Sequence, residues 1–244
     1  MAALKGSFAI LTGAAQGLGL AIARAYAQQG MKLALMDVQA DKLNTLAEEL
    51  EALGAACLPI PVDLADANAT QAAVELALSK FGKPRVLVHN AALLKERSLL
   101  EVTFPQWQLE MNIILQAAFL LSKAVWQPMI EAHGGSIVYV SSGSGIKGFV
   151  KEVAYCPAKH GQEGLMKVLA LEGQPYNIAV NTITPGAPMN TPMSAENYPE
   201  ELKQKWVDPA VLAPAFVYLA GIDAHDITGE RLNAWELAQQ HPII

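Results

Sequence analysis

Short runs of apolar residues alternate along the chain with longer stretches in which apolar positions recur every three or four residues. The short runs have the length of buried strands, and the longer stretches have the length of helices that connect parallel strands. The expected strands are FAILT from Phe8, KLALM from Lys32, CLPIPV from Cys57, RVLVH from Arg85, SIVYVS from Ser136, NIAVNTI from Asn177 and ERLNA from Glu230. This alternation predicts an α/β fold, a doubly wound sheet of about seven parallel strands with helices on both faces.

Helical stretches between these strands are expected at residues 19–29, 41–53, 68–81, 105–132 and 153–172. A further helix is expected after Asp208, because an aspartate can cap a helix start and Pro209 suits the first helical position. No repeat, low-complexity tract or linker separates two compositions. Residues 1–244 are therefore expected to form a single domain.

One irregular segment, residues 186–207, combines prolines and methionines with residues that favour turns. Such a segment predicts a mobile lid over a substrate within the domain. Met189, Met193, Tyr198 and Trp206 would supply adaptable apolar contacts for closure over a ligand. Packing in an oligomer is the alternative explanation for the same side chains.

Composition narrows the classes of function. Of the 244 residues, 52% are hydrophobic and 16% are charged, which supplies a continuous core and argues against disorder. The net charge of −6 and the absence of a basic run argue against nucleic acid as a partner. Two cysteines and five scattered histidines predict neither a disulfide framework nor a metal site.

The location of the protein is expected to be cytoplasmic. The first residues lack the layout of a signal peptide, because Lys5 precedes only a short apolar run. No segment offers the roughly twenty consecutive apolar residues of a membrane helix. A membrane is therefore not expected as a partner.

A glycine-rich loop, TGAAQGLG, follows the first expected strand from Thr12 to Gly19 and opens directly into a helix. Glycines at these spacings allow a tight turn and a close backbone approach, so that a pyrophosphate can lie at the positive end of the helix. An ordinary strand-to-helix turn is the alternative, since a glycine loop alone is a weak signal.

Asp37 ends the second expected strand, where a carboxylate can accept hydrogen bonds from the hydroxyls of an adenosine ribose. The same carboxylate would repel a 2′-phosphate. Gln16 and Val38 occupy the places where a cation would offset that repulsion, so NAD is favoured over NADP. Asp63, after the third strand, is a candidate adenine contact, with a helix cap or solvated loop carboxylate as the alternative.

Tyr155 and Lys159 are four residues apart and therefore share one face of the expected helix. Ser142 lies at the end of the preceding strand, at the edge where parallel sheets present functional side chains. A tyrosine whose pKa is lowered by a nearby ammonium and an oxidised nicotinamide can act as an acid or base, and a serine can bind the substrate oxygen. These residues favour the interconversion of an alcohol and a ketone.

Taken together, the motifs resemble the short-chain dehydrogenase/reductase family over nearly the whole chain. They occur in the order TGxxxGxG from Thr12, a version of NNAG at His89–Ala92, Asn112, Ser142, YxxxK from Tyr155, and Pro185–Gly186. The resemblance implies a Rossmann-like fold and a homodimer or homotetramer.

The same resemblance implies roles for four residues. Tyr155 would be the acid/base, and Ser142 would orient and polarise the substrate carbonyl. Lys159 would bind the nicotinamide ribose and tune Tyr155, while Asn112 would hold a water in a proton relay. The expected NAD-binding residues are Gly13, Gln16, Gly17, Leu18, Gly19, Asp37, Asp63, Leu64, Asn90, Ala91, Tyr155, Lys159, Pro185 and Gly186.

Three departures from the family pattern stand out. Ala92 replaces a glycine, and Pro188 lies where the family offers a backbone N–H to the nicotinamide carboxamide, which proline lacks. Thr191 comes one residue later than the usual threonine. The terminal Asp-Gly-Gly is absent after Gly229, and the sequence assigns that tail no role.

The leading hypothesis is an NAD-dependent oxidoreductase that interconverts a secondary alcohol and a ketone on a small molecule such as a sugar, polyol or hydroxy acid. A reductase of 3-oxoacyl thioesters is the alternative within enzymes. A non-catalytic NAD-binding regulator is the alternative from another class, against which the joint presence of Asn112, Ser142, Tyr155 and Lys159 argues.

Overall fold

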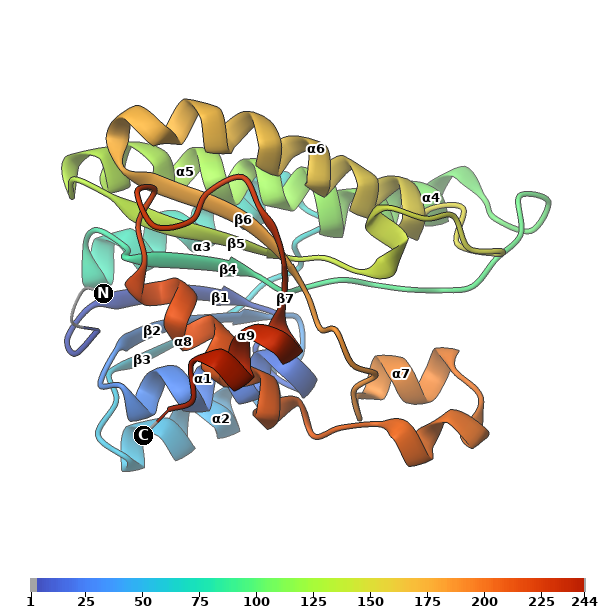
Figure 1. The fold of residues 1–244 in the computed structure, drawn as a ribbon, viewed down its shortest axis with the longest axis horizontal. Coiled ribbons are helices and arrows are strands. Elements are labelled where there is room, and N and C mark those ends of the chain that lie inside the picture. Colours follow the sequence, from blue (N-terminus) through green and yellow to red (C-terminus); the bar gives the residue numbers. More distant parts are fainter. Residues whose placement is uncertain (1–3, 244) are drawn as a thin grey trace.

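The computed structural model describes residues 4–243, which form one seven-stranded sheet (Figure 1). The strands are β1 Phe8–Thr12, β2 Lys32–Asp37, β3 Cys57–Pro61, β4 Val86–His89, β5 Gly135–Val140, β6 Ile178–Thr184 and β7 Arg231–Asn233. Every neighbouring pair is parallel, in the order β3-β2-β1-β4-β5-β6-β7. The predicted fold class is confirmed. Because the chain builds outward from β1 in both directions, a crevice is expected beyond the carboxyl ends of β1 and β4.

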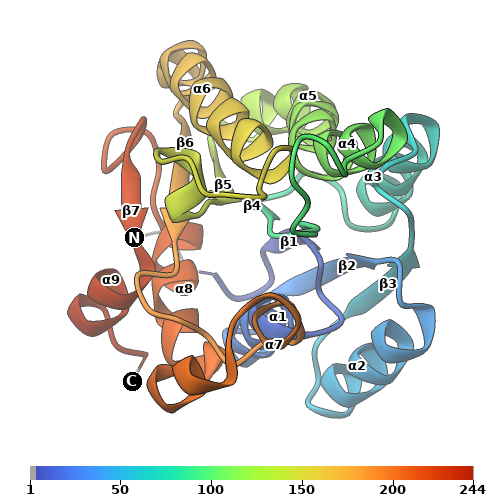
Figure 2. The ribbon, with the colours of Figure 1, turned by 90° about the vertical axis from the view of Figure 1, so that its right-hand side faces the viewer.

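Helices cover both faces of the sheet, and each face has its own cluster of buried apolar side chains (Figures 1 and 2). One face carries α1 Gly17–Gln28, α2 Ala40–Ala52, α8 Ala213–Gly221 and α9 Ala234–Gln240. The other carries α3 Ala67–Phe81, α4 Phe104–Met111, α5 Ala117–Glu131 and α6 Tyr155–Gly173. The strands between them read as continuous apolar runs because both of their faces are buried.

The helix expected over residues 105–132 is interrupted by a π-helical turn, Asn112–Gln116. Within this turn the N–H of Ala117 donates to the carbonyl of Asn112, five residues earlier. Such turns insert one extra residue into a helix and redirect its side chains, and they are frequent at functional sites. The periodicity of the sequence predicts this helical stretch but does not reveal the insertion within it.

The helical stretch Phe104–Glu131 is the one stretch among residues 4–243 that is long and apolar enough, by length and composition, to cross a membrane. Core helices pass the same test. Leu121, Val125 and Met129 on this stretch are buried in the cluster that covers the sheet.

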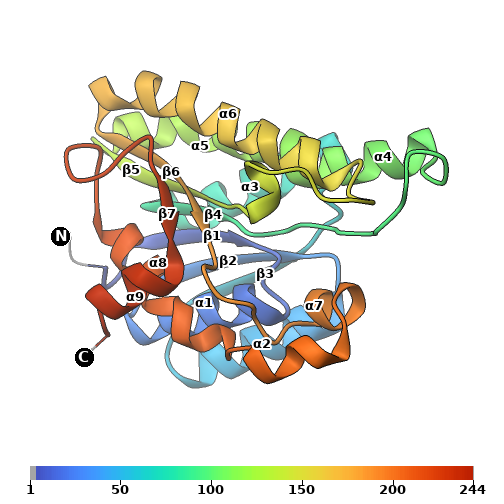
Figure 3. The same cartoon turned by 45° about the vertical axis from the view of Figure 1, so that its right-hand side comes forward.

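Residues 186–207 form a compact excursion beyond the carboxyl ends of the strands (Figures 2 and 3). It contains α7 Pro192–Asn197 and a 3₁₀ turn, Glu200–Lys205. Its two ends are joined, because the N–H of Val207 donates to the carbonyl of Pro188 at 2.9 Å and the N–H of Asn190 donates to the carbonyl of Val207 at 2.9 Å. The mobility expected of this segment stays a prediction.

The tail after Gly229 supports the carboxyl end of β6. Asn233 caps α9 by accepting the N–H groups of Trp235 and Glu236. Gly186 has a φ of +74°, and a Cβ at this position would lie 1.8 Å from Asn233 Oδ1. The close contact with the tail therefore requires a glycine there.

Candidate active site

A cavity of about 620 Å³ opens at the carboxyl edge of the sheet, where the crevice is expected. It extends along the ends of β1 to β6 and is closed on one side by residues of the 186–207 segment. Asp37 lines one part of it, and Ser142, Tyr155 and Lys159 line another. Its volume lies within the range of about 300–1,000 Å³ that is usual for ligand sites.

The glycine loop forms a close-packed turn between β1 and α1. Gly13 has a φ of +63°, and a Cβ there would lie 2.9 Å from the Cα of Ala91. A Cβ at Gly19 would lie 1.9 Å from the carbonyl oxygen of Gly13. Asn90 fastens the turn, because its Nδ2 donates to the carbonyls of Thr12 at 3.2 Å and Gly13 at 2.9 Å.

These contacts separate the roles of the loop residues. Gly13, Gln16, Gly17 and Leu18 line the cavity, whereas Gly19 is buried beneath it and permits the close packing of the loop. No side chain caps the start of α1. The first N–H groups of this helix are thus free to bind an anionic group such as a phosphate.

Asp37 is held rigidly at its end of the cavity. Its Oδ2 accepts the N–H of Ala15 at 3.0 Å, and its Oδ1 accepts the N–H of Gln39 at 3.0 Å. Carboxylate oxygens have further lone pairs, so both can still accept ribose hydroxyls.

Lys42 lies next to this end of the cavity and was missed in the sequence. Its Nζ donates to Gln16 Oε1 at 3.0 Å and to Gln39 Oε1 at 2.7 Å, and both glutamines line the cavity. A search limited to the loop and to the position after Asp37 cannot find it. The available signal is helical spacing, since Lys42 follows Gln39 by three residues and returns to the same side.

The remaining residues expected to bind the cofactor also line the cavity. They are Asp63, Leu64, Asn90, Ala91, Pro185 and Gly186. The Oδ1 of Asp63 also accepts the N–H of Ala65 at 2.9 Å, which is the local turn contact weighed as its alternative.

Two departures from the family pattern have simple structural outcomes. Ala92 is not among the residues with positive φ, so the backbone there does not require glycine. Pro188 lines the cavity, and its carbonyl is used to join the two ends of the 186–207 segment.

Ser142, Tyr155 and Lys159 come together from β5 and α6. Tyr155 is the first residue of α6, and Pro157 lies within the first turn, where its missing N–H is tolerated. Ser142 follows β5, and its Oγ accepts the N–H of Ser144 at 3.2 Å. The Nζ of Lys159 lies 5.6 Å from the centroid of the Tyr155 ring.

Burial opposes the charged forms of Tyr155 and Lys159. It is the main cause that raises the pKa of Tyr155. Tyr198 and Glu152 add to this rise, whereas the hydrogen bond with the Ser142 hydroxyl counters it. Burial lowers the pKa of Lys159 to about 7, against the effect of Glu163. Tyr155 is therefore protonated at neutral pH in the protein alone, while Lys159 titrates close to neutrality.

Asn112 is separated from this group. Its Nδ2 donates to the carbonyl of Ala65 at 3.3 Å, and its neighbour Ile113, not Asn112, lines the cavity. The structure brings Ser142, Tyr155 and Lys159 to one cavity but does not bring the side chain of Asn112 there. The water-holding role expected of Asn112 stays a prediction.

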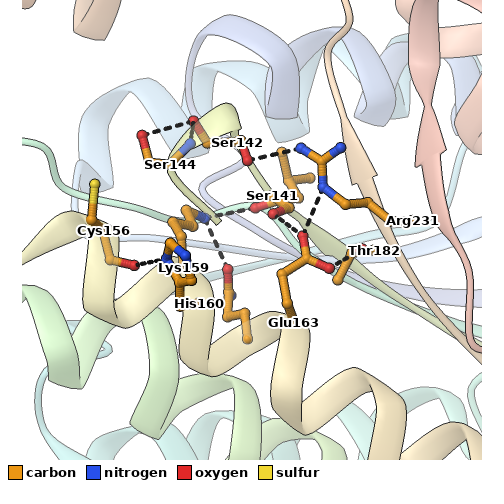
Figure 4. Close-up of polar contacts among 11 residues, drawn as sticks. Ser141, Ser142, Ser144, Cys156, Lys159, His160, Glu163, Thr182 and Arg231 are labelled. Carbon is orange, nitrogen blue, oxygen red and sulfur yellow. Dashed lines mark hydrogen bonds and ion pairs between the residues drawn. The ribbon is translucent and has the colours of Figure 1, made fainter. Parts of the chain in front are cut away.

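A buried ionic cluster beneath the cavity fixes the end of β5 (Figure 4). Glu163 accepts hydrogen bonds from Ser141 Oγ at 2.5 Å, Thr182 Oγ1 at 2.8 Å and Arg231 Nε at 3.2 Å. Arg231 Nη2 also donates to the carbonyl of Ser142 at 3.0 Å. The cluster thus ties the backbone that carries the Ser142 hydroxyl to α6, β6 and β7.

Other polar side chains near the site have local roles. Lys147 and Lys151 do not line the cavity, so they supply no cation to it. The Nδ1 of His160 contacts the carbonyl of Cys156 at 2.9 Å on its own helix. Within residues 4–243 no group of three His, Cys, Asp or Glu residues is arranged to hold a metal ion.

An oxidoreductase that binds a nicotinamide dinucleotide is the class of protein that this fold and cavity define. The family described as short chain dehydrogenase matches residues 7–202. The chain belongs to this family.

Named relatives include enzymes that differ in substrate. The chain is 37% identical over 182 residues to D-threitol dehydrogenase of Mycolicibacterium smegmatis, which covers 75% of this chain and 70% of the relative. It is 30% identical over 236 residues to 3-oxoacyl-(acyl-carrier-protein) reductase of Thermotoga maritima, and the match covers 93% of this chain and 95% of the relative. The structure is similar to the crystal structure of L-sorbose reductase from Gluconobacter frateurii, complexed with NADPH and L-sorbose. The TM-score is 0.86 at 28% identity, and the match covers 94% of this chain and 95% of the reductase chain.

The cavity fits the nicotinamide cofactor of the family. The uncapped start of α1 suits the pyrophosphate, and the carboxylate of Asp37 suits a ribose. At the other end, the Lys159 ammonium and the Tyr155 hydroxyl provide donors for a second ribose.

Proposed function

We propose that this protein is an NAD-preferring dehydrogenase that interconverts a secondary alcohol and a ketone. The observation that carries the proposal is one continuous cavity that has Asp37 at one end and Ser142, Tyr155 and Lys159 at the other. A cofactor-binding end and an acid/base end in a single cavity are what hydride transfer coupled to proton transfer requires.

In the oxidising direction the hydroxyl of the substrate loses its proton and its carbinol carbon loses a hydride. The bound nicotinamide supplies the hydride acceptor and a cationic ring. The Ser142 hydroxyl donates a hydrogen bond to the substrate oxygen, and the Tyr155 phenolate accepts the proton from it. Lys159 holds the ribose and, as an ammonium, lowers the pKa of Tyr155 from the raised value that burial imposes.

The preference for NAD rests on Asp37. Its carboxylate is fixed by two backbone N–H groups and cannot swing away from a 2′-phosphate. Lys42 supplies a partial counter-charge, but its ammonium is already held by Gln16 and Gln39. We therefore infer a preference for NAD with residual use of NADP.

Two classes of substrate have support. Small polyols and sugars are supported by the names of the threitol and sorbose enzymes. An acyl thioester is supported by the reductase that matches nearly the full length and by apolar side chains in the cavity, namely Leu93, Ile113, Met189 and Met193. We favour the polyol and sugar class, because the chain shares a higher identity with D-threitol dehydrogenase than with the 3-oxoacyl reductase, 37% against 30%.

The test is NADH absorbance with polyols, sugar acids, hydroxy acids, simple secondary alcohols and a 3-oxoacyl thioester, each with NAD(H) and NADP(H). Turnover of a polyol or sugar with NAD is expected. Turnover of the thioester alone would select the second class. Binding of NADH without turnover of any compound would leave the non-catalytic regulator as the better account.

We also propose that residues 1–244 form one dinucleotide-binding and catalytic domain. This domain forms a homodimer or homotetramer through the outward sides of α5 and α6. Phe119, Val168 and Leu171 are exposed on these helices, and exposed apolar groups of this kind mark interaction surfaces. Light scattering after size-exclusion chromatography should give a mass of two or four chains, and Leu171→Glu should reduce it.

A further inference from the structure

Gln162 is buried next to Lys159 and contacts it directly. The Nζ of Lys159 donates to Gln162 Oε1 at 3.0 Å, and Gln162 Nε2 donates to the carbonyl of Ile114 at 3.0 Å. An ammonium can only donate and a carbonyl can only accept, so these two contacts fix the orientation of the amide. Both side chains are almost completely buried.

The carbonyl of Ile114 belongs to the π-helical turn and has a second partner. His89 Nε2 lies 3.0 Å from it, and His89 Nδ1 lies 2.9 Å from Thr12 Oγ1. Burial, with the charge of Lys159 adding to its effect, lowers the pKa of His89 to about 3, so the ring is neutral at neutral pH. The ring therefore donates to Ile114 through Nε2 and accepts the Thr12 hydroxyl proton at Nδ1.

Thr12 completes a connected set of hydrogen bonds. Its Oγ1 accepts the N–H groups of Asn90 and Ala91, both at 3.1 Å, beside the glycine loop. The set thus runs from the loop through His89 and the Ile114 carbonyl to the Gln162 amide and the Lys159 ammonium, and every member is satisfied. Fully satisfied buried networks make side-chain positions rigid.

We propose that Gln162 is a positioning residue for Lys159, which its amide holds in place and keeps in the ammonium form. The inference rests on the function proposed above for Lys159. Val140 accepts a second N–H of Lys159 at 2.6 Å, so two of the three donors are used inside the protein. The third is left for the cavity that Lys159 lines.

The amide also limits where a proton can go. Gln162 bridges Lys159 to the carbonyl of the π-helical turn, and a side-chain amide does not exchange protons as a water does. On this side, Lys159 therefore meets an acceptor that takes no proton from it.

If Gln162 only fills space in the core, its replacement should leave the pKa of Lys159 unchanged. If its amide keeps Lys159 in the ammonium form, its replacement should change that pKa. The ionisable groups that face Lys159 among the described residues are Tyr155 and Glu163 on α6 and His89 at the end of β4. All three are unchanged in variants of Gln162. A change in the Lys159 titration then reports the loss of the amide itself.

The test follows the ¹³Cε resonance of Lys159 against pH in ¹³C-lysine-labelled protein, with the signal assigned from a Lys159→Arg variant. Gln162→Met keeps the size of the side chain but removes the acceptor, so the pKa of Lys159 should fall by about one unit. Gln162→Glu adds a negative charge at the acceptor, and the pKa should rise. Ser122→Ala, which removes a buried hydrogen bond to Tyr139 elsewhere in the core, should leave the pKa unchanged.

An unchanged pKa in Gln162→Met, or a shift of the same sign in both variants, would overturn the proposal. Should Gln162→Met fail to fold, the Gln162→Glu variant decides alone, since a pKa that does not rise contradicts the proposal. This titration needs no substrate, so its outcome does not depend on turnover. With an active substrate, Gln162→Met should also lower kcat about tenfold with little change in the KM for NAD and move the alkaline limb of the pH profile to lower pH.

Discussion

Asp37 and Lys42 place opposite charges at the same end of the cavity, and the balance between them sets the choice of cofactor. The carboxylate accepts two backbone N–H groups, whereas the ammonium is exposed and bound to two side-chain amides. A rigid charge discriminates more sharply than a mobile one. The carboxylate is therefore expected to dominate.

Removal of the Asp37 charge should shift the preference towards NADP. In Asp37→Asn the kcat/KM ratio of NADP to NAD should rise about tenfold or more, because the repulsion of a 2′-phosphate is lost. Adding Lys42→Ala to this variant should remove part of the gain, because no counter-charge then remains. Asp41→Asn, the same chemical change in the first turn of α2, should leave the ratio as it is. Steady-state kinetics with both cofactors gives the answer, and an unaltered ratio in Asp37→Asn would refute the assignment.

His89 should make the fold sensitive to acid. Its pKa is about 3 in the folded protein and near 6.5 in an unfolded chain, so the unfolded state binds more protons between these values. The free energy of unfolding should then fall as the pH falls from about 6.5 to about 3, by at most about 1.4 kcal/mol per pH unit from this group.

Urea denaturation at several pH values measures this slope. His89→Asn removes the titrating ring, and its slope should be shallower than that of the parent. His225→Asn, at an exposed position, should keep the slope of the parent. Equal slopes in all three proteins would show that His89 is not buried in its neutral form.

The residues predicted in the sequence are those whose neighbours are close along the chain. Tyr155 and Lys159 share a helix face, Asp37 ends a strand and Ser142 closely follows one, so local pattern was sufficient to place them in one cavity. Glu163 and Arg231 are 68 residues apart, and no local pattern pairs them. Gln162 was within reach, because it continues the helix face of Tyr155 and Lys159, but that spacing alone does not distinguish it from an ordinary core residue.

At the scale of elements, α6 is the helix on which the site depends. Its first turn carries Tyr155 and Lys159, its middle packs closely on the π-helical turn, and Glu163 joins it to the sheet. The sequence predicted this helix within two residues at its start and one at its end, because its periodicity and the position of Pro157 are local properties. The π-helical turn it packs against was not predicted, since a single inserted residue barely changes the periodicity.

Two glycines of α6 make a matched pair that tests this packing. A Cβ at Gly164 meets nothing within 4 Å, so Gly164→Ala should raise the free energy of unfolding by about 0.5–1 kcal/mol through the loss of backbone freedom in the unfolded chain. A Cβ at Gly161 would lie 2.5 Å from Leu115 Cδ2, so the Leu115 side chain must shift, and Gly161→Ala should have a free energy of unfolding about 1 kcal/mol or more below that of Gly164→Ala.

Chemical denaturation of both variants beside the parent is the measurement. The same substitution on the same helix is expected to stabilise the protein clearly less at Gly161 than at Gly164. Equal effects would mean that α6 and the π-helical turn do not pack as closely as described.

For the whole molecule, the parallel order of the sheet unites residues from six strand ends, β1 to β6, in a single cavity. The fold was predictable because seven apolar runs separated by long helices leave few arrangements other than a parallel sheet with helices on both faces. The path of residues 186–207 and the contact of the tail with Gly186 were not, since they depend on contacts between distant segments.

The most direct test of the account compares NADH binding with turnover in Tyr155→Phe, using the best substrate of the parent. The Kd for NADH, measured by fluorescence, should rise by no more than about tenfold, because one ribose donor is lost while Lys159 remains. Turnover should fall by about 10²- to 10⁴-fold, because the acid/base group is lost. Tyr198→Phe, which removes another hydroxyl from the same cavity, should keep turnover within about tenfold of the parent. Turnover by Tyr155→Phe close to that of the parent would contradict the assignment of Tyr155 and, with it, the proposed chemistry of the cavity.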